Sequence, residues 1–257
     1  MKLLALFTFI LLAVTGCSSI SKMDKDYSGL SEPVDRDYID FMASMGEVYL
    51  RSEDIHEIKL NSESLQYLDQ VYERILSNNE ILMSRGPKAR FHIIKSKAPF
   101  FFSLPKAQFF MSSGLVERYL KSEELFVSAL ASEILKSNRN IYEKKMMIPL
   151  GFYSSEKMIL MTRLRPETKF KINEWTYFVL KRAGYDSSAY LNWIQVQNRN
   201  TLDFSLFLGD AVVISKEEHL FKNFMAKQGV IGVEKKMNEA NSSKAFYKLL
   251  NNITDHK

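Results

Sequence analysis

The chain alternates between stretches with helical periodicity and short apolar runs. Residues 38–51 have apolar side chains at helical spacing and predict a first helix. Residues 60–80 predict a second helix, with Asn61 or Ser62 suited to cap its start by accepting a hydrogen bond from a free backbone N–H. Its apolar face consists of Leu65, Leu68, Val71, Tyr72, Ile75 and Leu76.

Short strands are predicted between residues 89 and 114. Residues 89–96, ARFHIIKS, are rich in β-branched and aromatic side chains and follow the turn-forming pair Gly86-Pro87. Residues 98–114 predict two more strands, separated at Pro105. These three runs lead us to expect a small antiparallel sheet.

Helical spacing returns after the strands. Residues 115–138 predict a helix in two parts, with Ser122 as the cap of the second part. Residues 171–197 predict two helices, and Gly184 ends the first of them because glycine readily adopts the left-handed conformation of a helix C-terminus. Residues 144–161 show no clear period. The order of elements indicates a mainly helical α+β fold, with short helices near the end of the chain over 216–230 and 243–253.

The first residues are typical of a secretory signal. Lys2 provides a positive start, and the apolar stretch over residues 3–14 is shorter than the about 20 residues that a membrane-spanning helix needs. Residues 14–17, VTGC, resemble the lipobox of bacterial lipoproteins. This resemblance implies that residues 1–16 are removed and that Cys17 becomes the lipidated N-terminus. The alternative is a plain signal peptide in which the cysteine occurs by chance.

The residues after the signal indicate a tether and one domain. No aspartate follows Cys17 to favour the inner membrane, so we expect anchoring to the outer membrane, facing the periplasm of a Gram-negative bacterium. Residues 17–36 are polar and have the composition of a flexible linker. Residues 37–257 are expected to form a single globular domain.

Composition excludes several classes of site. Cys17 is the only cysteine, so an internal disulfide, a cysteine nucleophile and a cysteine-based metal site are excluded. The formal charge is +5, from 35 basic and 30 acidic residues that are scattered along the chain. Scattered charge is typical of a solvated surface and does not indicate a nucleic-acid groove.

Residues 60–195 resemble the HtpX and CAAX prenyl endopeptidase family of zinc metallopeptidases in the order of their motifs. Residues 100–107, FFFSLPKA, stand where that family has a strand ending in Asn-Ala-Phe-x-Leu-Pro-Gly-Gly. Residues 129–136, ALASEILK, stand where it has the zinc-binding helix with His-Glu-x-x-His. Residues 182–186, RAGYD, match the end of a later family motif. The resemblance implies a metallopeptidase-like (zincin) domain.

The zinc ligands of that family are replaced in this chain. The resemblance puts Ser132 and Lys136 at the two histidine positions, Lys171 at the third ligand and Asn173 at the supporting aspartate, while Glu133 of the catalytic set is retained. A serine hydroxyl is a poor zinc ligand and an ammonium group has no lone pair. We therefore expect that the ancestral zinc is lost and that no other cofactor or metal replaces it.

Other interpretations of these residues stay open from the sequence. His56 begins the segment HEIKL, which lacks the second histidine and lies upstream of the main motifs, so we interpret it as a surface residue. Ser132 and Lys136 could act as a nucleophile and its base, although the sequence indicates no oxyanion hole. An active zinc metalloendopeptidase with an unconventional site is a further alternative.

Glu133 would be unfavourable as an unpaired buried carboxylate. We hypothesise that Lys136 or Lys171 pairs with it, so that an ammonium group replaces the charge of the zinc ion. The alternative is that both lysines point into water.

The expected function is that of a catalytically inactive metallopeptidase-like lipoprotein, a pseudopeptidase. Members of the family bind extended chains beside an edge strand, which is expected here at Phe109, Phe110, Met111 and Ser112. Backbone pairing needs no metal, so binding could outlast catalysis. The expected partners are the membrane, through the lipid, and envelope or outer-membrane proteins in quality control or assembly. A structural lipoprotein associated with lipid or peptidoglycan is the remaining alternative.

Overall fold

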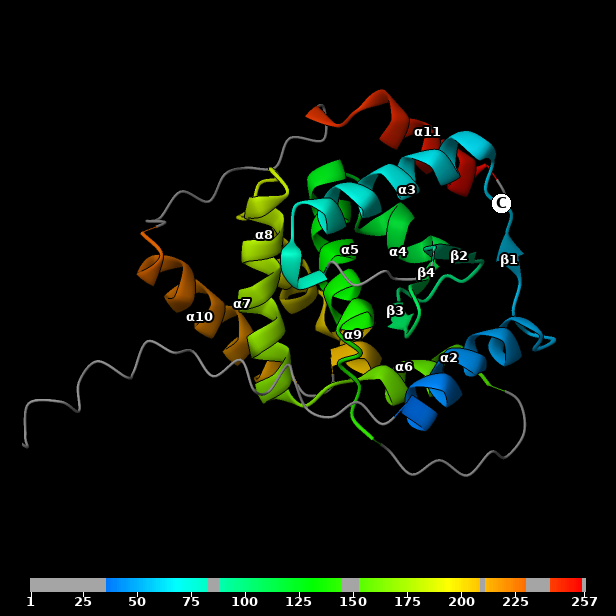
Figure 1. Cartoon of the computed structure of the whole chain (residues 1–257), viewed down its shortest axis with the longest axis horizontal. Coiled ribbons are helices and arrows are strands. Elements are labelled where there is room, and N and C mark those ends of the chain that lie inside the picture. Colours follow the sequence, from blue (N-terminus) through cyan, green and yellow to red (C-terminus); the bar gives the residue numbers. More distant parts are fainter. Residues whose placement is uncertain (1–35, 83–87, 145–152, 209–210, 230–240, 256–257) are drawn as a thin grey trace, which may run out of the picture. The chain divides into compact units, whose positions relative to one another are not determined.

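The computed structural model describes residues 36–82, 88–144, 153–208, 211–229 and 241–255, so the predicted signal, Cys17 and the rest of the tether up to residue 35 lie outside the described residues, while Arg36 begins a helix. No helix in these ranges is long and apolar enough to cross a bilayer. The helices are α2 (Arg36–Leu50), α3 (Ser62–Ser77), α4 (Ser113–Arg118), α5 (Glu123–Asn138), α6 (Ser155–Thr162), α7 (Pro166–Arg182), α8 (Ala189–Arg199), α9 (Thr201–Leu208), α10 (Ala211–Lys227) and α11 (Lys244–Thr254), with a short 3-10 turn η3 (Glu80–Leu82) (Figure 1).

One small sheet accompanies these helices. Its strands lie in the order β1 (Glu57–Ile58), β2 (Arg90–Ile94), β4 (Gln108–Ser112) and β3 (Phe101–Leu104). The mainly helical α+β class is thus confirmed. The prediction of a purely antiparallel sheet was wrong, because β2 and β4 are parallel while the other two pairs are antiparallel. Strand β3 pairs with one side of β4 and forms the edge of the sheet. The other side of β4 therefore pairs with β2, and these two strands run in the same direction.

The sheet separates two apolar clusters. Side chains alternate along a strand, so Phe109 and Met111 of β4 face the larger cluster, and Phe110 faces the smaller one. Helices α3, α5, α7 and α8 contribute to the larger cluster, while α2 and α6 complete the smaller one. In Figure 1, α2 and α6 lie together on the side of the sheet opposite α3. Burial on both faces explains why the strands are continuous apolar runs.

Local signals end or begin α3, α5 and α7 where the sequence predicts them, whereas α7 starts before the predicted residue 171, α10 starts before residue 216 and α9 was not predicted. Asn61 caps α3 by accepting a hydrogen bond from the Ser64 backbone N–H at 2.8 Å, and Ser122 caps α5 in the same way. Helix α7 ends before Gly184, which has a φ of +72°. Helix α6 was missed, since residues 144–161 were expected to be irregular. It has only eight residues, too few to establish a period in the sequence.

Helix α5 is the central helix of the domain. All its residues from Leu125 to Ser137 are buried, and it packs against β3, α3, α7 and α8. A helix that is buried all round carries small and apolar residues on every face, which hides the usual amphipathic pattern. Any charged residue on α5 must therefore find its partner inside the protein.

Candidate functional site

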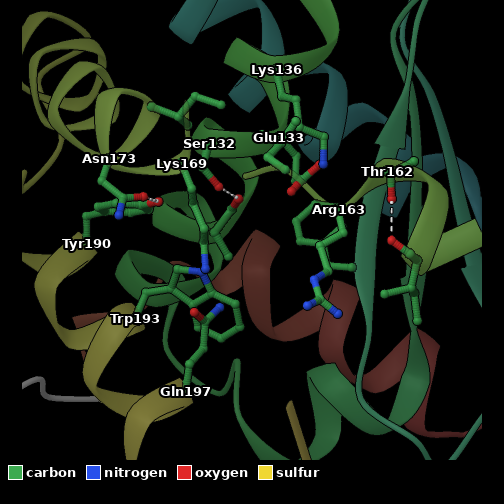
Figure 2. Close-up of a pocket in the computed structure, with 15 residues that line it drawn as sticks. Ser132, Glu133, Lys136, Thr162, Arg163, Lys169, Asn173, Tyr190, Trp193 and Gln197 are labelled. Carbon is green, nitrogen blue, oxygen red and sulfur yellow. Dashed lines mark hydrogen bonds and ion pairs between the residues drawn. The ribbon is translucent and has the colours of Figure 1, made fainter. Parts of the chain in front are cut away.

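A cavity of about 60 Å³ lies between α5, α7, α8 and the segment that joins α6 to α7 (Figure 2). We call it the central pocket. Several apolar side chains line it, including Phe101, Ile159 and Trp193. Its polar lining includes Ser132, Glu133, Lys136, Lys169, Asn173 and Gln197.

Ser132 and Lys136, two of the three predicted ligand positions, line this pocket together with Glu133. Lys136 Nζ lies 2.8 Å from Glu133 Oε2, and the side chains are only 6% and 7% exposed, respectively. Ser103 of β3 donates a hydrogen bond to the same carboxylate oxygen at 2.7 Å. The hypothesis that a lysine ammonium group pairs with Glu133 is confirmed for Lys136. The pair lies within α5, so it does not by itself join two helices.

Lys171 does not belong to the pocket, and its prediction as the third position was wrong. Its side chain is exposed, whereas Lys169 and Asn173 line the cavity. The reason is helical geometry, since residues four apart share a face of α7 and a residue two positions away points to the other side. The structure therefore assigns the α7 position beside the pocket to Lys169.

Lys169 belongs to a second, partly buried ion pair, in which its own side chain is 22% exposed. Its ammonium group donates to Glu217 Oε2 at 2.7 Å, and Glu217, on α10, is 1% exposed. Asn173 donates to the other oxygen of Glu217 at 2.7 Å and accepts a hydrogen bond from the Tyr190 hydroxyl at 2.6 Å. This chain of contacts joins α7, α8 and α10. Sequence reasoning missed Lys169, Glu217 and Tyr190.

Two tyrosines border the ion pairs, Tyr190, which is buried, and Tyr142, which is partly buried. Burial raises the pKa of Tyr190, and the nearby carboxylate of Glu217 raises it further. Burial likewise raises the pKa of Tyr142, whose hydroxyl lies 3.3 Å from Ser103 Oγ, and the charge of Glu133 acts in the same direction. Both hydroxyls thus stay protonated at neutral pH, where they act as hydrogen-bond donors and not as bases.

Ser132 is not arranged as a nucleophile. Its hydroxyl donates to the backbone oxygen of Ala129 at 2.8 Å, a common contact for serine inside a helix. Lys136 is paired with Glu133, and within the described ranges Ser132 and Lys136 share no hydrogen bond. The serine–lysine interpretation therefore gains no support from the geometry.

The residues at the pocket do not fit a zinc ion. Zinc in a metallopeptidase binds neutral imidazoles and a carboxylate that have free lone pairs. Here the cavity is lined by the ammonium groups of Lys136 and Lys169, which would repel a divalent cation. Within the described part of the chain, no three His, Cys, Asp or Glu residues form a group that could hold a metal ion.

The predicted peptide-binding edge strand, Phe109 to Ser112, is not at an edge, and that prediction was wrong. These residues belong to β4, which pairs with β2 on one side and with β3 on the other. Both rows of its backbone groups are therefore already paired, and a further strand cannot add to it. Strand β3 lies at the edge, but its residues are at most 2% exposed, and α5 and α6 pack against it.

The described histidines lie outside the pocket lining. His56 is exposed in the loop before β1, as the sequence analysis interpreted it. His92 Nδ1 lies 2.7 Å from Glu57 Oε1, and His219 is exposed on α10.

Comparison with protein-family models and with curated proteins finds no relative of this chain. No protein-family model matches the chain, and no curated protein is significantly similar to it. The resemblance to the HtpX and CAAX prenyl endopeptidase family thus stays a proposal, based on the motif order and on the position of Glu133 at the pocket.

Proposed function

We propose that this chain is a catalytically inactive metallopeptidase-like lipoprotein that binds segments of other proteins without cleaving them. One observation carries this proposal: the Glu133–Lys136 ion pair is buried beside the central pocket, with 2.8 Å between Nζ and Oε2. In an active enzyme of the resembled family, Lys136 would be a histidine and a zinc ion would supply the positive charge. The lysine provides that charge permanently, so the fold needs no metal.

Both ion pairs are consistent with a domain that stays folded without zinc, because each charged side chain already has a partner of opposite charge. Glu133 and Lys136 balance each other on α5, while Lys169 and Glu217 balance each other between α7 and α10. Buried charges that are paired and hydrogen-bonded can hold neighbouring elements in one arrangement. The central pocket is accordingly a preformed cavity, with room for one small group of a ligand.

Binding of a protein segment is proposed at the central pocket instead of at strand β4. Addition of a strand to β4 is excluded by its two partners. The pocket offers apolar walls, including Ile159 and Trp193, together with polar groups that could orient one side chain or chain end of a bound segment. The lipobox-like residues 14–17 support an anchor at the periplasmic face of the outer membrane, where envelope proteins would be the partners.

Binding without cleavage is the outcome that tests this proposal. The full chain, purified in detergent, is mixed with a urea-unfolded outer-membrane β-barrel protein, and complex formation and fragments are followed over hours. We expect a complex and an intact substrate. The control is the double variant Glu133→Gln/Lys136→Met, which removes the carboxylate without leaving a buried charge unpaired. Cleavage by the wild type that disappears in the double variant would show that the protein is an active peptidase.

A further inference from the structure

A larger, open groove lies where the end of β2 meets β1, α4 and α11. We call it the basic groove. Its volume of about 750 Å³ is within the roughly 300–1,000 Å³ of ligand sites, whereas the central pocket has room for one small group only. Two apolar and four charged side chains contribute to its lining: Ile58 and Ile253, together with Lys95, Lys97, Glu117 and Arg118.

Backbone contacts hold the walls of the basic groove in place. The Arg118 side chain donates to the backbone oxygen of Lys97 at 2.7 Å, and the Gly114 N–H donates to that of Ser96 at 2.9 Å. A Cβ atom at Gly114 would lie within 2.5 Å of the Lys97 oxygen, so α4 can approach this segment closely only because residue 114 is glycine. The groove is therefore preformed, and a ligand needs to order little of the protein when it binds.

The charges at the basic groove favour an acidic ligand. Lys95 and Lys97 are exposed, and within the described ranges neither forms an ion pair. Arg118 lies 2.8 Å from Asp203, and Glu117 is the acidic residue of the lining. Three basic and two acidic residues leave one positive charge in excess. Acidic side chains of a ligand would meet the two lysines at little cost, because both ammonium groups stay in contact with water.

The basic groove borders an open edge of the sheet. Ile58 belongs both to the groove and to β1, which lies at the outer side of the sheet (Figure 1). The Lys95 N–H donates to His56 O at 2.7 Å, and backbone groups alternate in direction along a strand, so those of Glu57 point away from β2. In the part of the chain that the structure describes, they make no hydrogen bond.

This edge favours a polypeptide ligand. An extended chain carries both a donor and an acceptor in one plane, as the free N–H and C=O of Glu57 require. The Glu57 carboxylate does not oppose an acidic ligand in the groove. It lies on the other face of the sheet from Ile58, where it contacts His92 Nδ1 at 2.7 Å.

We propose that the basic groove binds an extended, acidic segment of another protein. The segment pairs with the backbone of Glu57, which sets its position. Its acidic side chains approach Lys95 and Lys97, and its apolar side chains contact Ile58 and Ile253. This inference rests on the proposed function in that the partner is a protein segment, but it assigns that segment to a second site.

Titration calorimetry on the full chain in neutral detergent tests the ligand class. The probes are the capped peptide Val-Val-Glu-Glu-Val-Glu and the same peptide with glutamine in place of glutamate. We expect the acidic peptide to bind about tenfold more tightly at low salt and to lose most of this preference in about 1 M salt. The proposal is overturned if the two peptides bind equally, or if neither binds while a short-chain anionic phospholipid does.

A pair of double variants links this preference to the groove. We expect Lys95→Met/Lys97→Met to weaken binding of the acidic peptide about tenfold and binding of the glutamine peptide much less. The control Lys216→Met/Lys227→Met removes the same charge from exposed positions on α10 and should leave the affinity unchanged. Equal affinity of both double variants for the acidic peptide would show that the groove is not its site.

A proline substitution tests the pairing with β1. Glu57→Pro removes the outward N–H, and proline is tolerated on an edge strand where that group faces solvent. Glu57→Ala is the control, because both variants lose the contact with His92. We expect the proline variant to bind the acidic peptide about fivefold more weakly than the alanine variant, which corresponds to the loss of one hydrogen bond. Equal binding by two variants with wild-type circular dichroism would refute the pairing and with it the proposal.

Failure of this inference and failure of the proposed function give different results. A protein that forms the complex with unfolded substrate but binds neither peptide would refute the inference alone. A protein that cleaves the substrate would refute the proposed function, while acidic-peptide binding that is lost in Lys95→Met/Lys97→Met would still support the basic groove.

Discussion

We expect the Lys136→Met variant to have a free energy of unfolding about 3–5 kcal/mol below that of the wild type, because it leaves the buried carboxylate of Glu133 without its cation. Methionine has nearly the length and volume of lysine, so packing changes little. The hydroxyl of Ser103 still donates to Glu133, but a neutral donor does not replace the lost charge. Urea unfolding, followed by circular dichroism, measures the difference between variant and wild type.

Two controls separate the ion pair from a general effect of losing a lysine. Lys171→Met removes an exposed ammonium group and should change stability by less than about 0.5 kcal/mol. The double variant Glu133→Gln/Lys136→Met leaves no buried charge unpaired and should recover most of the lost stability. If Lys136→Met is no less stable than Lys171→Met, the buried pair is not important for the fold.

Rebuilding the zinc ligands should create a metal site at the central pocket. The variant combines Ser132→His, Lys136→His and Lys169→Glu, so that two imidazoles one helical turn apart on α5 face a carboxylate from α7. Glu217→Gln is added because Glu217 would lose its lysine partner. In the wild type, two lysines balance two glutamates. In the variant, the charge of one zinc ion balances Glu133 and the new carboxylate at position 169.

We expect this variant to bind one zinc ion with a Kd of about 1 µM or lower, whereas the wild type should show no measurable affinity. Zinc at 100 times the Kd would then raise its unfolding free energy by about 2.7 kcal/mol. The matched control keeps Lys169 and Glu217 and carries Lys171→Glu with the two histidine substitutions, and it should bind zinc far more weakly. Equal affinity of the two variants would mean that Lys169 does not occupy the ligand position.

Features that depend on neighbouring residues could be predicted from the sequence. The caps at Asn61 and Ser122 each satisfy a backbone N–H three residues further on, and the left-handed φ of Gly184 follows from its lack of a Cβ atom. Ser132, Glu133 and Lys136 share a pocket because the spacing within one helix fixes their relative directions.

Features that depend on distant residues could not be predicted. The place of β4 inside the sheet is decided by which strands it meets, and its apolar sequence suits an edge or a centre equally well. Glu217 lies 44 residues after Asn173, and nothing near it in the sequence indicates that the two side chains meet. Lys169 could have been found from the helical face that it shares with Asn173, whereas counting back from the RAGYD motif led to Lys171.

The metal content of the purified wild-type chain is the most direct test of the central claim that lysine ammonium groups have replaced the zinc ion at this site. The full chain is exchanged into zinc-containing buffer, freed of unbound metal and measured by elemental analysis beside the rebuilt variant. We expect far less than one zinc per wild-type chain and about one per chain of the rebuilt variant. One zinc per wild-type chain that is lost in the Glu133→Gln/Lys136→Met variant would contradict this account.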